Sequence, residues 1–343
     1  MHISRTYRSY FIMLILLLVI VFMLNISLGS VAIPLDEILI TLTGGDPSRS
    51  TWNYIITDYR LPKSITAILT GSGLALSGLM MQTLFRNPLA GPFVLGISSG
   101  ASLGIAILIF GAGIFGGMLG GIIMNSWGLV IASALGSFLV LLAVLAVTLK
   151  VKDTMAILII GLMFGSVTSA VVAVLAYFSD AEQLQQYIFW SFGSLGNVSW
   201  QGIIILSINC FLGLILSILC IKPLNALLLG ENYAQSMGMN LKKTTLLVIV
   251  ATSLLAGSIT AFAGPIAFIG LAVPHLTRQF FTTSNHWILV PAVILSGSIL
   301  MLICDTIAQL PFSEYTLPIN AITSLVGAPV VIWLLVRKRK LLF

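Results

Sequence analysis

Residue types that carry out chemistry are scarce in this chain, and their spacing forms no recognised catalytic or metal-binding motif. Its 343 residues include 3 histidines and 3 cysteines. Cys210, Cys220 and Cys304 stand in separate apolar segments with no CxxC pair and no neighbouring histidine, a pattern typical of buried cysteines. Neither a HExxH zinc motif nor a GxxxxGKS/T phosphate-binding loop occurs. The sequence therefore predicts no metal site and no cofactor on this chain. It does not favour an enzyme, which needs a nucleophile with its base or a metal cluster.

Two ionisable residues stand in unusual settings. His275 lies three residues before Arg278 with no carboxylate nearby, which favours a structural, hydrogen-bonding histidine over a proton relay. Asp305 falls inside an apolar run, near its end. Ion-coupled secondary transporters place ionisable residues at mid-membrane to bind the coupling ion. A single such acid offers few ligands for a coupling ion, so a secondary transporter is the weaker alternative.

Hydropathy determines which elements can position these residues. The chain is 58% hydrophobic and 8% charged, whereas soluble domains carry about 25% charged residues. A soluble globule could not bury so much apolar surface, and disordered chains and coiled coils also need abundant charge. The period-two pattern of barrel strands is absent, so helices must satisfy the backbone in lipid. We predict an all-α polytopic membrane protein, with one transmembrane domain over residues 1–343 and about ten transmembrane helices.

Ten apolar runs approach the roughly 20 residues that one crossing requires. They cover residues 10–28, 63–84, 93–109, 129–149, 155–178, 202–221, 246–262, 266–278, 287–308 and 322–336. The eighth is short and holds Pro274, so we expect it to tilt, break or start within residues 264–265. The first has no small-residue cleavage site, so we do not expect a cleaved signal peptide.

The charges of the loops predict the orientation. With the N-terminus inside, the cytoplasmic segments hold thirteen basic and two acidic residues, and the external ones hold three basic and seven acidic residues. This distribution satisfies the positive-inside rule and places both termini in the cytoplasm. The basic excess thus reflects topology, and it does not indicate nucleic-acid binding.

Four polar or turn-forming stretches interrupt the apolar runs, at residues 29–63, 82–104, 222–240 and 263–278. The first is external, contains turn-forming prolines and glycines, and ends in RLPK. This motif puts Arg60 and Lys63 at the start of the second run, where cations by default anchor a helix at the membrane interface. The second and fourth contain residues that end helices or let them approach closely, which suits either tight packing or a translocation path. These are Asn87, Pro88, Ser98, Ser99, Gly100, Gly264, Pro265 and Pro274.

The third stretch predicts a pair of short cytoplasmic helices. Pro223 suits the start of the first helix, and Gly230 breaks it. Glu231 then lies favourably near the second N-terminus, and Gly238 suits its C-terminal cap. Helices that lie on lipid favour lysine and arginine, yet none occurs between Pro223 and Leu241. The pair is therefore expected to enter a groove of a partner protein.

Seven segments, in order, resemble the FecCD family, the permease subunits of type II ABC importers for ferric siderophores, haem and cobalamin. They are RLPK (60–63), QTLFRNPLA (82–90), LGISSGAS (95–102), LGENYAQSMG (229–238), GPIAFIGLAVPHLTR (264–278), DTIA (305–308) and GAPVVIWLL (327–335). Each segment is weak alone. Their shared order over nearly the whole chain, on a ten-helix profile, makes the resemblance specific.

The resemblance implies two permeases, identical or paralogous, around a central path in the bacterial cell (inner or plasma) membrane. Two ATPase subunits, which would hold ATP and Mg²⁺, would lie on the cytoplasmic side, and a substrate-binding protein would lie outside. Residues 223–238 would be coupling helices, and the helix from residue 155 would line the path. The ATPase contacts would be Leu224, Leu228, Gly230, Glu231, Ala234, Met237 and Gly238. Asp153 and Thr154 match a cytoplasmic gate, and Arg60 and Lys63 match positions that dock acidic residues of the binding protein.

The sequence departs from the family pattern at the predicted outer surface. Gln309 stands where relatives often have a third external arginine, and residues 316–320 read TLPIN where Glu-Leu-Pro-Ile-Gly is common. The substrate is not fixed by these motifs. An iron–siderophore chelate is the first expectation on family frequency, with haem and cobalamin as alternatives.

Overall fold

The computed structural model describes residues 5–111, 126–148, 151 and 154–336, and every regular element in that part of the chain is a helix. The elements are α1 (Arg5–Ser27), α2 (Leu35–Leu42), α3 (Ser50–Tyr54), the π-helix η1 (Ile55–Arg60), α4 (Leu61–Leu84), the 3-10 helix η2 (Pro92–Leu95), α5 (Ile97–Gly111), α7 (Ser126–Thr148), α8 (Thr154–Tyr177), α9 (Ala181–Ser191), α10 (Trp200–Leu227), α11 (Glu231–Ser236), α12 (Leu241–Ala263), α13 (Ile269–Phe280), α14 (His286–Ala308) and α15 (Ile319–Val336). The all-α prediction is confirmed.

Seven of the described helices are long and apolar enough to cross a membrane. They are α1, the continuous Ser50–Leu84 helix that includes α4, and α7, α8, α10, α12 and α14. The helices α5 and α15 are apolar but shorter, and α13 has 12 residues. The chain is therefore a multi-pass membrane protein, and the expected ten crossings require these three shorter helices to cross as well.

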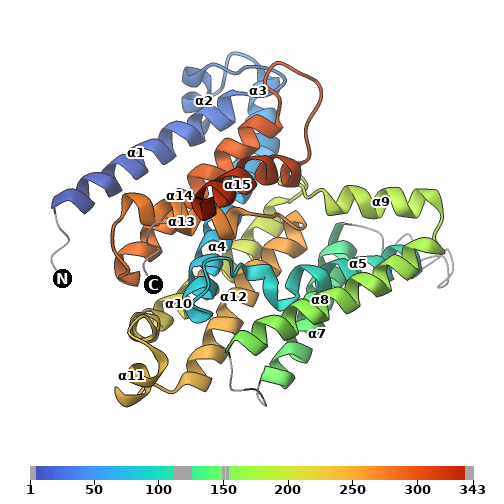
Figure 1. Cartoon of the computed structure of the whole chain (residues 1–343). Coiled ribbons are helices and arrows are strands. Elements are labelled where there is room, and N and C mark those ends of the chain that lie inside the picture. The colour runs from blue at the N-terminus through green and yellow to red at the C-terminus, as the bar shows by residue number, and fades with distance from the viewer. Residues whose placement is uncertain (1–4, 112–125, 149–150, 152–153, 337–343) are drawn as a thin grey trace.

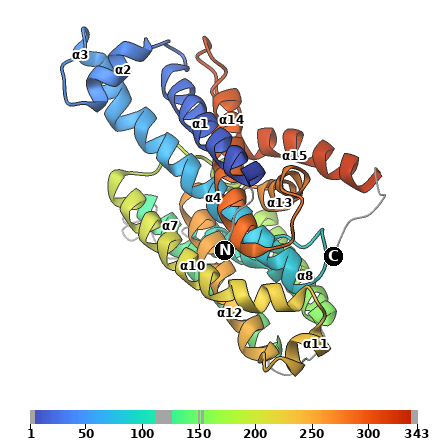
Figure 2. The same cartoon turned by 90° about the vertical axis from the view of Figure 1, so that its left-hand side faces the viewer.

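The central helix is α4, which packs against α10, α12, α13 and α14 (Figures 1 and 2). Most of its side chains are buried. It meets α14 backbone to backbone, since a Cβ atom on Gly71 would clash with the carbonyl oxygen of Gly297, and a Cβ on Gly297 with that of Gly71. Without a hydrophobic drive in lipid, such small-residue contacts let two helix backbones pack directly. The sequence thus makes α4 and α14 a closely fitted pair.

A second group is formed by α5, α7 and α8 (Figure 1). A Cβ atom on Gly100 would lie 2.6 Å from the carbonyl oxygen of Gly136, so α5 and α7 also meet backbone to backbone. Ser99 faces Gly165 of α8, since a Cβ there would lie 3.2 Å from its Oγ. Gly100 and Ser99 therefore serve helix packing in this structure.

The stretch between the first two predicted spans holds more structure than its turn-forming residues suggested. Residues 29–59 contain α2, α3 and most of η1. Ile38 of α2 is fully buried, in a cluster with Ile26, Ile33 and Ile56. The short helix α2 buries this isoleucine against the end of α1, which accounts for a helix within a stretch rich in turn-forming residues.

The two ends of the bundle differ. In both views α2 and α3 lie at one end and α11 lies at the other (Figures 1 and 2). Following the orientation predicted from loop charge, we name the end with α2 and α3 the outer end and the end with α11 the inner end.

Candidate functional site

Arg60 lies at the outer end, where η1 meets α4, and its side chain points into the protein. The residue is 8% exposed. Its Nη1 donates to the carbonyl oxygens of Ile26 at 2.7 Å and Ser27 at 2.9 Å, and its Nη2 donates to that of Val31. A guanidinium presents five donors in a rigid fork, which suits several carbonyls at once. Arg60 therefore fastens the segment after α1 to the start of α4.

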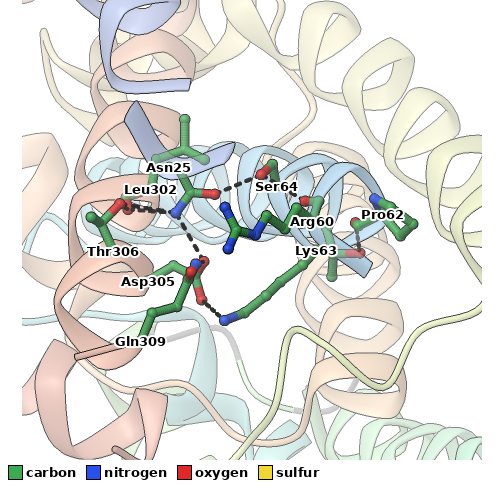
Figure 3. Close-up of polar contacts among 10 residues, drawn as sticks. Asn25, Arg60, Pro62, Lys63, Ser64, Leu302, Asp305, Thr306 and Gln309 are labelled. Atoms are coloured by element: carbon green, nitrogen blue, oxygen red, sulfur yellow. Dashed lines mark hydrogen bonds and ion pairs between the residues drawn. The ribbon is translucent and has the colours of Figure 1, made fainter. Parts of the chain in front are cut away.

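Lys63 and Asp305 form an ion pair between α4 and α14 (Figure 3). The Lys63 Nζ lies 3.1 Å from Asp305 Oδ1, and the side chains are 22% and 2% exposed. The other carboxylate oxygen accepts hydrogen bonds from Asn25 Nδ2 at 3.0 Å and Gln309 Nε2 at 2.7 Å. Ser64 donates to Asn25 Oδ1 at 2.6 Å, which brings α1 into the network. One cation and two amides thus replace the water that this buried carboxylate has lost.

These contacts bear on the predicted docking role of Arg60 and Lys63. The Arg60 guanidinium already donates to three backbone carbonyls, so an acidic residue of a partner would have to replace these hydrogen bonds. Lys63 is the more exposed of the two cations. Gln309, which replaces an expected arginine, donates to Asp305 instead of presenting a charge outside. Docking stays a prediction, and it now rests mainly on Lys63.

The predicted coupling segment, residues 223–238, lies at the inner end. The expectation of two separate short helices was wrong, because α10 continues through Pro223 to Leu227 and only α11 stands apart. The break falls where predicted. Gly230 has φ +108° and Gly238 has φ +86°, backbone conformations that glycine adopts without strain. The Gly238 and Met239 amides then bond the carbonyls of Gln235 and Ala234, which closes α11.

The side chains of this segment divide into buried and exposed sets. Leu224 and Ala234 are fully buried, while Leu228 and Glu231 are partly buried. The prediction that Ala234 faces a partner groove is wrong, because this chain itself covers its side chain. Three large apolar side chains are exposed instead: Leu229 at 64%, Tyr233 at 54% and Met237 at 65%. In a water-facing position, such a patch is typical of a protein-binding surface.

The predicted gate lies mostly outside the described residues. Asp153 is not described, and Thr154 is described only as the first residue of α8. The gate therefore stays a prediction.

The interrupted stretches 82–92 and 264–278 meet near the inner half of α4. Asn87 Oδ1 accepts from the Leu89 amide at 2.9 Å, and the Pro88 carbonyl lies 2.7 Å from His275 Nε2. His275 is buried and makes this hydrogen bond, so the structural reading of that histidine is confirmed. Pro274 is buried inside α13, which begins at Ile269 and continues through this proline to Phe280, so the expected start within residues 264–265 was wrong.

Gly264 and Pro265 begin the non-helical link between α12 and α13. Gly264 has φ +76° and lies close to Gly193 and the Trp190 carbonyl. Asn320 supports the link, since its Oδ1 accepts from the Ala267 amide at 3.0 Å. This departure from the family pattern therefore has a structural function.

A cavity of about 670 Å³ lies beside this link. Four aromatic residues line it, Trp127, Phe189, Trp190 and Phe262, together with the uncharged polar residues Gln186 and Asn197. None of its lining residues is charged, so the cavity suits an uncharged, largely apolar group. The described residues also contain no group of three or more histidines, cysteines or acids that could hold a metal ion, and the three cysteines are buried and free.

Sequence reasoning missed a polar cluster at the inner end. Asn225 of α10, Asn285 and His286 at the start of α14, and Thr83 of α4 are joined by hydrogen bonds. No spacing rule connects residues so distant along the chain. It also missed α9, although Asp180 and Gln183 have the spacing of a capping box and the structure forms one.

Comparison with known proteins agrees with this architecture. The model of the FecCD transport family matches residues 17–337. The chain belongs to the FecCD transport family. Among FecCD relatives, the vitamin B12 import system permease protein BtuC of Klebsiella pneumoniae is 35% identical, with 98% of this chain and 96% of that protein covered. The hemin transport system permease protein HmuU of Yersinia pestis is 33% identical, with 95% of each chain covered.

The three-dimensional structure of this chain is also similar to a solved structure. It is described as an inward-facing conformation of a provisionally assigned metal-chelate type ABC transporter. The likeness has a TM-score of 0.82 at 29% sequence identity and covers 96% of this chain and all of that one. The two named relatives are permease proteins of a vitamin B12 import system and of a hemin transport system, and the resemblance to the FecCD family read from the seven sequence segments is confirmed.

Proposed function

We propose that this chain is the membrane permease of an ATP-driven importer, which receives a metal chelate from an extracytoplasmic binding protein and passes it to the cytoplasm. The observation that carries this proposal is the family match over residues 17–337 on a multi-pass helical bundle. In this proposal α5, α13 and α15 cross the membrane as well, which makes ten spans with both termini inside. The protein lies in the bacterial inner or plasma membrane.

In this proposal, ATP hydrolysis by a partner protein bound at the inner end drives transport. A partner ATPase holds ATP and Mg²⁺ and receives the segment 223–238, with Leu229, Tyr233 and Met237 as the contacts that its groove desolvates. Leu224 and Ala234 support this surface from inside the chain. Gly230 and Gly238 fix the ends of α11, and Glu231 favours its N-terminus. An aromatic residue with two aliphatic neighbours is the kind of anchor that dominates protein interfaces.

Transport needs an alternating path between two permease copies, identical or paralogous. Asp153 and Thr154 form its cytoplasmic gate in this proposal, and α8 lines it. Seven large apolar residues among the described part of α8, and Phe178 directly after it, are exposed on this chain, as an intersubunit or lipid-facing helix requires. Gly264, Pro265 and the neighbouring cavity border the outer part of the bundle, where an incoming ligand first meets the permease.

A secondary transporter is a poorer fit to the geometry. The membrane acid that such a carrier would use for ion binding, Asp305, is already held by Lys63, Asn25 and Gln309. The exposed apolar surface of α11 would also lack a partner.

Uptake experiments are needed to identify the chelate that the importer transports. One relative belongs to a vitamin B12 import system and the other to a hemin transport system, and their sequence identities to this chain are nearly equal. We therefore propose that the substrate is a bulky metal chelate. An iron–siderophore complex is the first candidate, with haem and cobalamin as alternatives. Deletion of the permease gene in its host, followed by uptake assays with radioactive iron–siderophore, haem and cobalamin, identifies the substrate. We expect loss of one of the three activities and its return with the wild-type chain. If all three are retained, the proposed substrate class is wrong.

A further inference from the structure

The polar cluster at the inner end joins α10, α14 and α4, because the side chains of Asn225 and Thr83 both contact His286. Asn225, two residues before the end of α10 at Leu227, directs its amide at the start of α14. Its Oδ1 accepts from the backbone N–H of His286 at 2.9 Å and lies 2.8 Å from His286 Nδ1. Its Nδ2 donates to Asn285 Oδ1 at 3.1 Å. A single side chain thus caps the first turn of α14 and fixes the imidazole at the same time.

The chemistry of the side chains limits the hydrogen-bond directions in this cluster. The carbonyl oxygen of Asn225 can only accept, so His286 Nδ1 carries a proton. In the neutral imidazole Nε2 is then an acceptor, and Thr83 Oγ1 lies 2.9 Å from it. The single proton of the Thr83 hydroxyl can go to this nitrogen or to the carbonyl oxygen of Leu79, which also lies 2.9 Å from Oγ1. We infer that it is donated to His286, because the Leu79 carbonyl also belongs to the backbone of α4 whereas Nε2 has no other hydrogen-bond partner in the part of the chain that the structure describes. His286 is completely buried, so loss of either bond leaves a buried polar atom without a partner.

Thr83 belongs to α4, and α4 is fastened to α14 at three levels. At the inner end Thr83 bonds His286, in the middle the backbones touch at Gly71 and Gly297, and at the outer end Lys63 pairs with Asp305. A helix pair held at both ends and in close contact between them moves as one body, because packed interfaces resist continuous deformation.

We propose that Asn225, His286 and Thr83 form the joint through which α11 and the α4–α14 pair move together. Asn225 lies in the same short segment as α11, six residues before its first residue. A shift of α11 is thereby passed to α14 and α4, and through them to the outer end at Lys63 and Asp305. The three residues act as positioning residues. This inference rests on the proposed function, in which α11 contacts the ATPase and the outer end meets the binding protein.

The test uses the complete permease–ATPase complex in lipid nanodiscs. Basal ATP hydrolysis, its stimulation by the binding protein, and the apparent melting temperature are measured together. Thr83→Val keeps the shape of the side chain and removes only the hydroxyl, while Thr83→Ser keeps the hydroxyl. Asn225→Ala removes the other half of the joint. Asn209→Ala is the matched control, since Asn209 is on the same helix and its amide donates within it, to Ile205.

We expect Thr83→Val and Asn225→Ala to lower the stimulation of ATP hydrolysis by the binding protein about fivefold or more, which is the size of effect that typical coupling between two sites produces. Basal ATP hydrolysis should be retained. Thr83→Ser and Asn209→Ala should behave as the wild type. Wild-type stimulation in both Thr83→Val and Asn225→Ala would overturn the joint and leave the proposed function intact. A proportional fall in basal and stimulated rates, or a lower melting temperature that explains the loss, would also overturn it. Failure of the wild-type chain to bind an ATPase would remove both proposals.

Discussion

Lys63 of α4 and Asp305 of α14 pair at 3.1 Å across the outer end of the helix pair that shares the most extensive contact in the described structure. Removing one partner of a buried pair leaves the other charge uncompensated. We therefore expect Lys63→Ala to lower the free energy of unfolding by about 3 kcal/mol. The double variant Lys63→Met/Asp305→Asn should recover most of this loss, because an asparagine oxygen can still accept from Asn25 and Gln309.

Thermal unfolding in detergent, followed by tryptophan fluorescence, measures these differences. Lys242→Met serves as the control, since Lys242 is an exposed lysine on α12. A single Lys63→Ala variant as stable as the wild type would contradict the structural importance of the ion pair.

The same double variant separates docking from folding. It removes the Lys63 charge without leaving the Asp305 carboxylate unpaired, so any loss of binding-protein affinity reflects the missing cation. Rim charges mainly steer association and set its salt dependence. We expect weaker association at low ionic strength and a flatter dependence on salt, measured by titration of the labelled binding protein. Unchanged affinity and an unchanged salt slope would assign Lys63 to structure alone.

The inner surface is tested at Tyr233 of α11 and at Met237, which directly follows α11 and lies one turn after Tyr233. Changing both to glutamate places two charges where the ATPase groove must be desolvated, at a cost of several kcal/mol in association by ordinary hot-spot values. The variant should insert normally but fail to co-purify with the ATPase. Gln235→Glu adds a charge to the same helix at an exposed residue on a different face from Tyr233 and should co-purify. Normal co-purification of the double variant would show that this surface does not bind the ATPase.

Orientation can be measured with single cysteines in a background that lacks the three buried native ones. Asp46→Cys and Glu182→Cys are at exposed positions in segments that loop charge places outside, and Asn232→Cys is at an exposed position in α11. An impermeant thiol reagent should label the first two in intact cells and should label Asn232→Cys only after lysis. Labelling of Asn232→Cys in intact cells would reverse the assignment of the inner and outer ends.

The sequence predicted the features that depend on local composition. Apolar runs identified the long helices, and Gly230 and Gly238 marked the ends of α11. The structural histidine at residue 275 also followed from its neighbours. These features are local because backbone preference and burial in lipid act over a few residues.

The remaining features depend on contacts between distant residues. Arg60 looked like an interfacial anchor, but its partners Ile26, Ser27 and Val31 come from the other end of a long loop. The partner of Lys63 lies more than two hundred residues away, as does that of Thr83. Ala234 looked exposed because α11 was expected to be surrounded by a partner, whereas this chain itself covers its inner face. Pairing and burial of this kind are set by tertiary packing, which a single sequence does not display.

The most direct test of the account is transport by the purified system in proteoliposomes. The permease is reconstituted with its ATPase, the binding protein is loaded with the chelate identified in cells, and uptake is compared under three conditions. These are ATP with Mg²⁺, a non-hydrolysable nucleotide, and a proton or sodium gradient without ATP. The account predicts uptake only with ATP, Mg²⁺ and the binding protein together. Uptake driven by an ion gradient, with neither the ATPase nor the binding protein present, would contradict it.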